Sequence, residues 1–100
     1  MLFEVETPLG FTVRCSEEYW AIIRTIKHPV MAERLEDVKQ TLVDPDEVRR
    51  SQKDVDVLLF YRADQKRWVC AVIRRLNGDG FLITTYPTDA IKSGVRIWSR

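Results

Sequence analysis

One histidine, an arginine–serine step and a pair of hydroxyl side chains are the residues of this sequence best suited to chemistry. His28 is the single histidine, and imidazole, with an ordinary pKa of about 6.5, suits proton transfer at neutral pH. Arg50 is followed by Ser51, and an arginine fork with a neighbouring hydroxyl suits phosphate oxygens. Thr85 and Tyr86 add hydroxyls that can orient a phosphate or donate to a departing oxygen. Together these residues would suit a phosphodiester.

Each of these residues also has a purely structural interpretation. His28 can cap a helix or form a hydrogen bond with the backbone. Arg50 and Ser51 can be a solvated helix end, where the helix dipole favours cations. Thr85 and Tyr86 are good strand formers. The sequence alone leaves both interpretations open.

Basic residues also occur in adjacent pairs, although the net charge is only +1, with 16 basic and 15 acidic side chains. The pairs are Arg49-Arg50, Lys66-Arg67 and Arg74-Arg75. If they converge, a local basic surface can exist on a nearly neutral protein. The alternative is that they are solvated ends of helices and strands. Tyr61 and Arg62 end one predicted strand and must point to opposite faces, so only one can face a shared site.

Most other catalytic signatures are absent from the sequence. One histidine and no cysteine cluster give too few ligands for zinc, and proline capping accounts for the acids at 44, 46 and 47. The chain has no phosphate-binding glycine loop and no G-x-S-x-G elbow. Cys15 and Cys70 lie far apart and read as reduced and at least partly buried. We therefore expect neither a metal nor a cofactor.

The residue patterns along the chain predict an α+β fold in which two helices precede the main sheet. Residues 3–15 alternate around Pro8-Leu9-Gly10 and predict a β-hairpin. Ser16 is a good N-cap for a helix ending near His28, with Tyr19, Trp20, Ile22, Ile23 and Ile26 facing inward. Pro29 can start a second helix with an apolar seam of Met31, Leu35, Val38 and Leu42. Asp44-Pro45 predicts a short helical turn through Val48.

From Val55 the pattern changes to that of strands. The runs VDVLLFYR, RWVCAVIRR and GFLITTYP, joined by short turns, predict an antiparallel meander. The run GVRIW predicts a last strand at the edge, which gives a three- to four-stranded antiparallel sheet. The 100 residues predict a single domain. No run is long enough to span a membrane, and an acidic N-terminus unlike a signal peptide predicts a cytoplasmic protein.

Three segments of the sequence also resemble a known superfamily. They are KHPVMAERLEDVKQTLVDPDEVRRS, VLLFYR and WVCAVIRRLNGDGFLITTYPTDAIKSG. In this order they resemble phage and bacterial families related to barnase, EndoU, the tRNA-cleaving colicins and the RelE toxins. The resemblance covers roughly residues 16 to 98, and its most specific parts are the His-Pro step, the T-L-x-D-P-D segment and the G-F-L-I-T-T-Y run.

The resemblance implies metal-independent RNA cleavage, in which the 2′-hydroxyl attacks the neighbouring phosphate. It implies His28 as general acid or base, Arg50 with Ser51 as phosphate binders, and Thr85 and Tyr86 at the polar end of a late strand. Substrate-binding roles are expected for Arg34, Tyr61, Arg62 and Lys66. The implied partners are RNA, such as tRNA or mRNA, and an antitoxin protein. Two alternatives stay open: a non-catalytic module that binds RNA or protein through the same face, and a structural domain that oligomerises through its edge strand.

Overall fold

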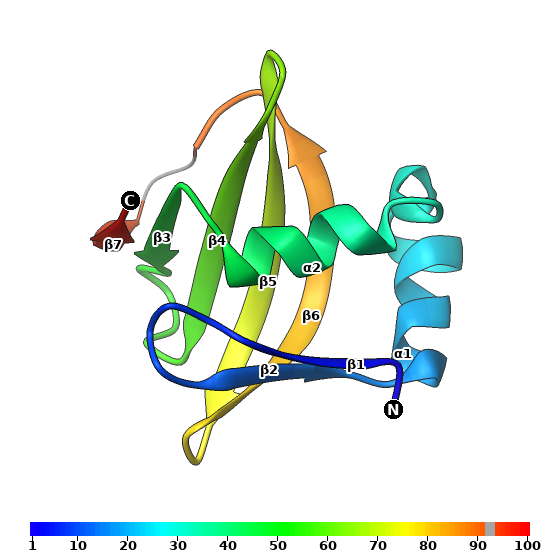
Figure 1. Ribbon diagram of the computed structural model, residues 1–100, viewed down its shortest axis with the longest axis horizontal. Helices are drawn as coiled ribbons and strands as arrows, with labels where there is room; N and C mark the ends of the chain where they lie inside the picture. The colour runs from blue at the N-terminus through cyan, green and yellow to red at the C-terminus, as the bar shows by residue number, and fades with distance from the viewer. Residues whose placement is uncertain (92–93) are drawn as a thin grey trace.

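The computed structural model describes residues 1–91 and 94–100 and has helices packed against a mixed sheet (Figure 1). Residues 92 and 93, part of the segment that carries the resemblance, lie outside the described residues. Seven strands pair in the order β1-β2-β6-β5-β4-β3-β7. Their bounds are β1 Phe3–Glu6, β2 Thr12–Cys15, β3 Glu47–Arg50, β4 Val57–Asp64, β5 Arg67–Leu76, β6 Asp79–Thr88 and β7 Val95–Ser99. The class is α+β as predicted, with more strands than the three or four expected.

The first helical segment changes its winding partway along. Helix α1 (Glu17–Ile22) begins at the predicted cap, where the Ser16 hydroxyl accepts a hydrogen bond from the Tyr19 backbone N–H at 3.0 Å. It continues as a π-helix over Ile23–Lys27, and this wider turn shifts the direction of later side chains. Trp20 and Ile23 are buried as predicted, but Ile22, at the end of α1, and Ile26, in the π-helix, are exposed, so their predicted inward positions are wrong.

The second predicted helix is two pieces. Pro29 starts a 3₁₀ turn, Pro29–Met31, and helix α2 (Leu35–Val43) follows after a break. Val38 and Leu42 of α2 are fully buried, as the apolar seam predicted. Among the described residues, no helix is long and apolar enough to cross a membrane.

The main sheet is the predicted meander of β4, β5 and β6, extended on both sides. The β1–β2 hairpin joins it through a short parallel pairing, with Val13 opposite Gly80 and Arg14 opposite Phe81. Gly80 suits this crossing, because a Cβ there would lie 3.0 Å from both the Phe11 and the Val13 side chains. The parallel pairing makes the sheet mixed, where the sequence predicted antiparallel pairing only.

Residues 47–50 form strand β3, so the predicted helical turn through Val48 is wrong. Val48 is fully buried opposite Phe60 of β4, and this tertiary contact outweighs the local capping signal of Asp44-Pro45. On its other side β3 pairs with β7, with a bulge between Val48 and Arg49. Strand β7 is thus the edge strand that the GVRIW run predicted.

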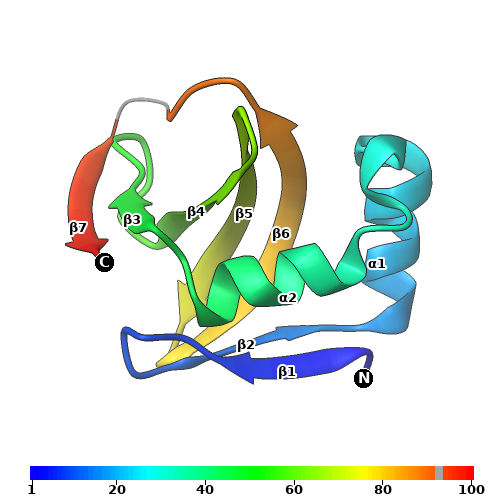
Figure 2. The ribbon, with the colours of Figure 1, turned by 45° about the horizontal axis from the view of Figure 1, so that its top comes forward.

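The sheet has two faces of different character. Val48, Phe60 and Ala71 are cross-strand partners in the hydrophobic core, on the face that α2 crosses in Figures 1 and 2. Strand residues alternate between faces. The other face, called the second face below, therefore carries the row of partners Glu47, Tyr61, Cys70 and Tyr86. Helix α1 stands beside β6 at the margin of the sheet (Figure 2).

Candidate functional site

His28 lies against Tyr86 of β6. The two ring centroids are 5.3 Å apart and the ring planes are tilted by 43°. Because Tyr86 belongs to the row on the second face, this contact brings the single histidine to the sheet surface that α2 does not cover. Both side chains are partly exposed. The contact therefore joins two predicted site residues that lie far apart in the sequence.

The local sequence explains why His28 projects toward the sheet. Pro29 disfavours the helical conformation in the residue before it, and His28 has φ −146° and ψ 77°. Its backbone N–H donates to the Ile23 carbonyl at 2.7 Å, closing the π-helix, and its own carbonyl accepts from the Met31 N–H at 3.0 Å. These two hydrogen bonds fix the His28 backbone between the π-helix and the 3₁₀ turn that follows. The imidazole therefore belongs to neither helical turn.

Tyr86 is held as a neutral phenol. Burial raises its pKa above the ordinary value, and the hydrogen bond with the Cys70 side chain and the nearby Tyr61 act in the same direction. Tyr61 and Cys70, its neighbours along the row, are fully buried. A phenol that keeps its proton is a hydrogen-bond donor across the physiological pH range.

This shift predicts a loss of stability in alkaline solution. In the unfolded chain Tyr86 ionises near the ordinary pKa of 10.0, whereas the folded protein keeps the proton to higher pH. Above about pH 10 the unfolded state binds fewer protons, so the free energy of unfolding falls as pH rises. In the Tyr86→Phe variant this fall should be shallower in urea unfolding measured across that range. Parallel curves for the two proteins would contradict the assignment.

Thr84, rather than Thr85, shares the second face with Tyr86. Thr85 is fully buried on the core face of the sheet, and its hydroxyl donates to the Cys70 carbonyl at 2.8 Å. Thr84 lies opposite Val72 and two residues before Tyr86, so strand alternation places it on the second face, and the bulge in this pairing lies between Leu82 and Thr84. Over residues 1–91 and 94–100, Thr84 Oγ1 is the one buried side-chain polar atom without a hydrogen-bond partner. A buried hydroxyl without a partner is uncommon in folded proteins.

Lys27 supplies a cation next to this cluster. Its Nζ donates to the Tyr19 hydroxyl at 2.8 Å and to the Ile83 carbonyl at 3.1 Å. The Tyr19 hydroxyl itself donates to the Ile83 carbonyl at 2.8 Å. The Ile83 carbonyl belongs to the part of β6 beyond its pairing with β2, and these hydrogen bonds satisfy it. They also fix the exposed Lys27 ammonium group next to His28 in the sequence.

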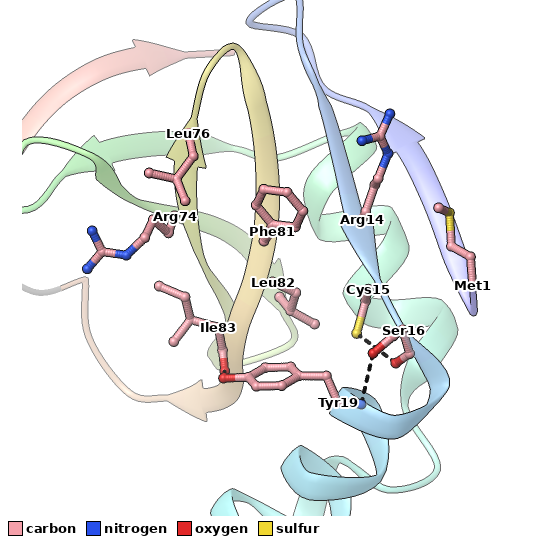
Figure 3. Close-up of a pocket in the computed structure, with 10 residues that line it drawn as sticks. All are labelled: Met1, Arg14, Cys15, Ser16, Tyr19, Arg74, Leu76, Phe81, Leu82 and Ile83. Carbon is pink, nitrogen blue, oxygen red and sulfur yellow. Dashed lines mark hydrogen bonds between the residues drawn. The ribbon is translucent and has the colours of Figure 1, made fainter.

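A groove of about 620 Å³ begins at Tyr19 and Ile83 and follows β6 toward Phe81 (Figure 3). Figure 3 shows the Tyr19 ring reaching from α1 toward Ile83, with Phe81 and Leu76 on one side and β2 on the other. The groove is mostly apolar, and Phe81 offers a partly exposed aromatic ring. Arg14 and Arg74 also line it.

Both arginines of the groove already have acidic partners. Arg14 pairs with Glu4 and, at 3.0 Å, with Asp79, and these carboxylates raise the pKa of its guanidinium. Arg74 pairs with Asp54 at 2.7 Å. The pKa of the Asp54 carboxyl is lowered by a hydrogen bond from the Asp56 backbone and then by Arg74. The groove is therefore suited to a flat, weakly polar group rather than to a phosphate.

Arg50 and Ser51 lie away from the His28–Tyr86 contact. Arg50 is the partner of Leu58 on the core face, at the end of β3. Ser51 follows β3, and its hydroxyl accepts from the Lys53 backbone N–H at 3.1 Å. The sheet thus separates these predicted phosphate binders from His28.

The four predicted substrate-binding residues are also dispersed. Arg34 bonds to Asp37 at 2.9 Å and to Asp64 at 2.7 Å, which raises its pKa and ties the start of α2 to the end of β4. Tyr61 is on the second face and buried, while Arg62 points to the opposite face, as strand alternation required. Lys66 is exposed in the turn between β4 and β5.

The structure also identifies site residues that sequence reasoning missed. Lys27 is adjacent to His28 in the sequence, and that position was the available signal. For Thr84 the available signal was strand alternation, which places residues two apart, such as Thr84 and Tyr86, on the same face. The groove beside α1 had no local signal, since β2 and β6 lie far apart in the chain.

No group of three or more metal-ligating side chains occurs in the described part of the chain. Comparison of the chain with models of protein families, with curated proteins and with solved structures finds no match.

Proposed function

We propose that this protein is a metal-independent endoribonuclease-like protein whose active site lies on the second face around His28 and Tyr86. The observation that carries the proposal is the ring contact, 5.3 Å between centroids, between the single histidine and a phenol held neutral by burial. A proton-transfer group and a fixed hydrogen-bond donor are the minimum that cleavage by an internal hydroxyl requires. The resemblance to the barnase, EndoU, colicin and RelE families supports the same chemistry.

In the proposed reaction His28 accepts the proton of a ribose 2′-hydroxyl. The 2′-oxygen then forms a bond to the neighbouring phosphorus, and the bond from phosphorus to the 5′-oxygen breaks. The departing 5′-oxygen takes a proton from the imidazolium or from the Lys27 ammonium. The products are a 2′,3′-cyclic phosphate and a free 5′-hydroxyl, and no oxidant, water or metal enters this step.

The remaining groups have binding roles in this proposal. Tyr86 donates a hydrogen bond to a phosphate oxygen, and Lys27 offsets the charge that develops there. The unpartnered Thr84 hydroxyl completes the phosphate contacts. The apolar groove that begins at Tyr19 receives a base of the same strand, because every base has a face that can stack on an aromatic ring such as Phe81. Unstacked bases occur in single strands and loops, so single-stranded RNA is the expected substrate.

The test is incubation of the purified protein with single-stranded RNA in the presence of a metal chelator. We expect fragments that end in a 2′,3′-cyclic phosphate and begin with a 5′-hydroxyl, and no cleavage of DNA of the same sequence. Fragments that carry a 5′-phosphate, or activity that the chelator removes, would overturn the proposal. In a cell, the resemblance implies a toxin, held inactive by an antitoxin protein, that cuts tRNA or mRNA.

A non-catalytic module that binds RNA or protein through the second face is the second candidate. Two observations favour it: the net charge is +1, and both arginines of the groove have acidic partners. It predicts saturable binding and intact RNA in the same incubation.

A further inference from the structure

A second, smaller pocket lies on the other side of the molecule from the His28–Tyr86 contact. It has a volume of about 220 Å³, equivalent to about seven water molecules at 30 Å³ each. Arg50, Arg75 and Asp56 line it with the apolar side chains of Leu9, Leu58 and Ile97. Leu58 belongs to the core face of the sheet, so the pocket is separate from the second face.

The two arginines of this pocket differ from most arginines in the protein. Neither Arg50 nor Arg75 forms an ion pair within residues 1–91 and 94–100. Carboxylates do pair with Arg14, Arg34, Arg49, Arg67, Arg74 and Arg100. The Asp56 carboxylate lines the same pocket but forms no ion pair with either arginine, so a bound anion would relieve the repulsion that remains between the two guanidinium groups.

The Arg75 side chain is also held in place. The Arg75 guanidinium lies over the Phe11 ring, with its carbon 4.4 Å from the ring centroid, and the Arg75 N–H donates to the Asp56 carbonyl at 2.8 Å. Stacking on a ring leaves the N–H edge of a guanidinium open for hydrogen bonds. Arg50 is in β3, paired with Leu58 on one side and with Val95 on the other. Little conformational freedom of the Arg75 side chain would therefore be lost when it binds a ligand, while Arg50 contributes a fixed backbone position.

We propose that Arg50 and Arg75 form a binding site for a phosphate group, independent of the RNA-cleaving site. Arginine forks match phosphate oxygens in a two-pronged geometry. The Asp56 carboxylate lines the same pocket and opposes an anion, but it can accept a hydrogen bond from a hydroxyl beside the phosphate. The site therefore fits a small phosphate monoester with a hydroxyl group, such as a sugar phosphate, better than inorganic phosphate.

The test is calorimetric titration of the full chain with inorganic phosphate and with ribose 5-phosphate at low salt. Saturable binding is expected, tighter for the ester. Arg75→Gln and Arg50→Gln should each weaken it by about tenfold or more. The matched control is Arg24→Gln, an exposed arginine on the π-helix, which should bind like wild type. Asp56→Asn should bind inorganic phosphate more tightly, because a repelling charge is removed, and this gain cannot result from misfolding.

Several results would overturn the proposal. The absence of saturable binding of either ligand to the wild type is one, and equal binding by wild type and both arginine variants is another. Equal affinity for the two ligands would retain the phosphate site and assign it to free phosphate. If Arg50→Gln or Arg75→Gln instead weakened the binding of RNA, the pocket would belong to the RNA surface, and its independence would be disproved.

Discussion

Replacing His28 with alanine is expected to lower the rate of RNA cleavage by about 10²- to 10⁴-fold, the usual contribution of a positioned acid–base group. His28 is the only imidazole in the chain, so no second histidine can take its place. Its side chain is partly exposed and outside the hydrophobic core, so the folded state should persist. The measurement is the initial rate of cleavage of a labelled single-stranded RNA.

Two controls separate chemistry from folding and from binding. Arg24→Ala alters an exposed side chain on the π-helix that precedes His28 and should keep the wild-type rate. The thermal unfolding midpoints of both variants should lie close to that of the wild type. A cleavage rate unchanged by His28→Ala would remove His28 from the mechanism and leave the second face as a binding surface at most.

The largest expected effect on stability is that of Phe60→Ala, a loss of about 3–5 kcal/mol in the free energy of unfolding. Phe60 is fully buried in β4 between Val48 and Ala71, and its ring meets Phe11 edge-on with 6.5 Å between centroids. Truncation would leave a cavity between the sheet and the elements that cover it. Because a domain of this size has a total stability of about 5–15 kcal/mol, the variant should be close to unfolding.

Urea unfolding of wild type and variant measures this loss directly. Val55→Ala is the matched control, since Val55 is 70% exposed and its truncation should change stability by about 0.5 kcal/mol or less. A loss below about 1 kcal/mol for Phe60→Ala would show that the core is not packed around this ring.

Features encoded by neighbouring residues could be predicted from the sequence. The hairpin, the Ser16 cap and the β4–β5–β6 meander depend on turn residues, caps and alternation within a few positions. The break at His28 is of the same kind, because Pro29 acts on the residue before it. This is why the single histidine could be placed outside the packed helices before its contact with Tyr86 was known.

Features set by contacts between distant segments could not be predicted. Residues 47–50 carry a helix-start signal but form β3, because Val48 packs against Phe60 between two strands. The parallel contact of β2 with β6 has no signal in either strand alone.

Strand alternation decides which candidate hydroxyls of β6 share a face. Thr84 and Tyr86 are two residues apart in a regular stretch, so they lie on one face and Thr85 lies on the other. The irregularity that has no sign in the sequence is the π-helix, in which Ile26 is exposed.

The measurement that most directly tests the proposed function compares wild type and His28→Ala on one single-stranded RNA with a chelator present. We predict that only the wild type produces fragments ending in a 2′,3′-cyclic phosphate, while both proteins bind the RNA with similar affinity. RNA that stays intact at high concentrations of wild-type protein would contradict the proposed catalysis, and cleavage by both proteins alike would contradict the proposed site.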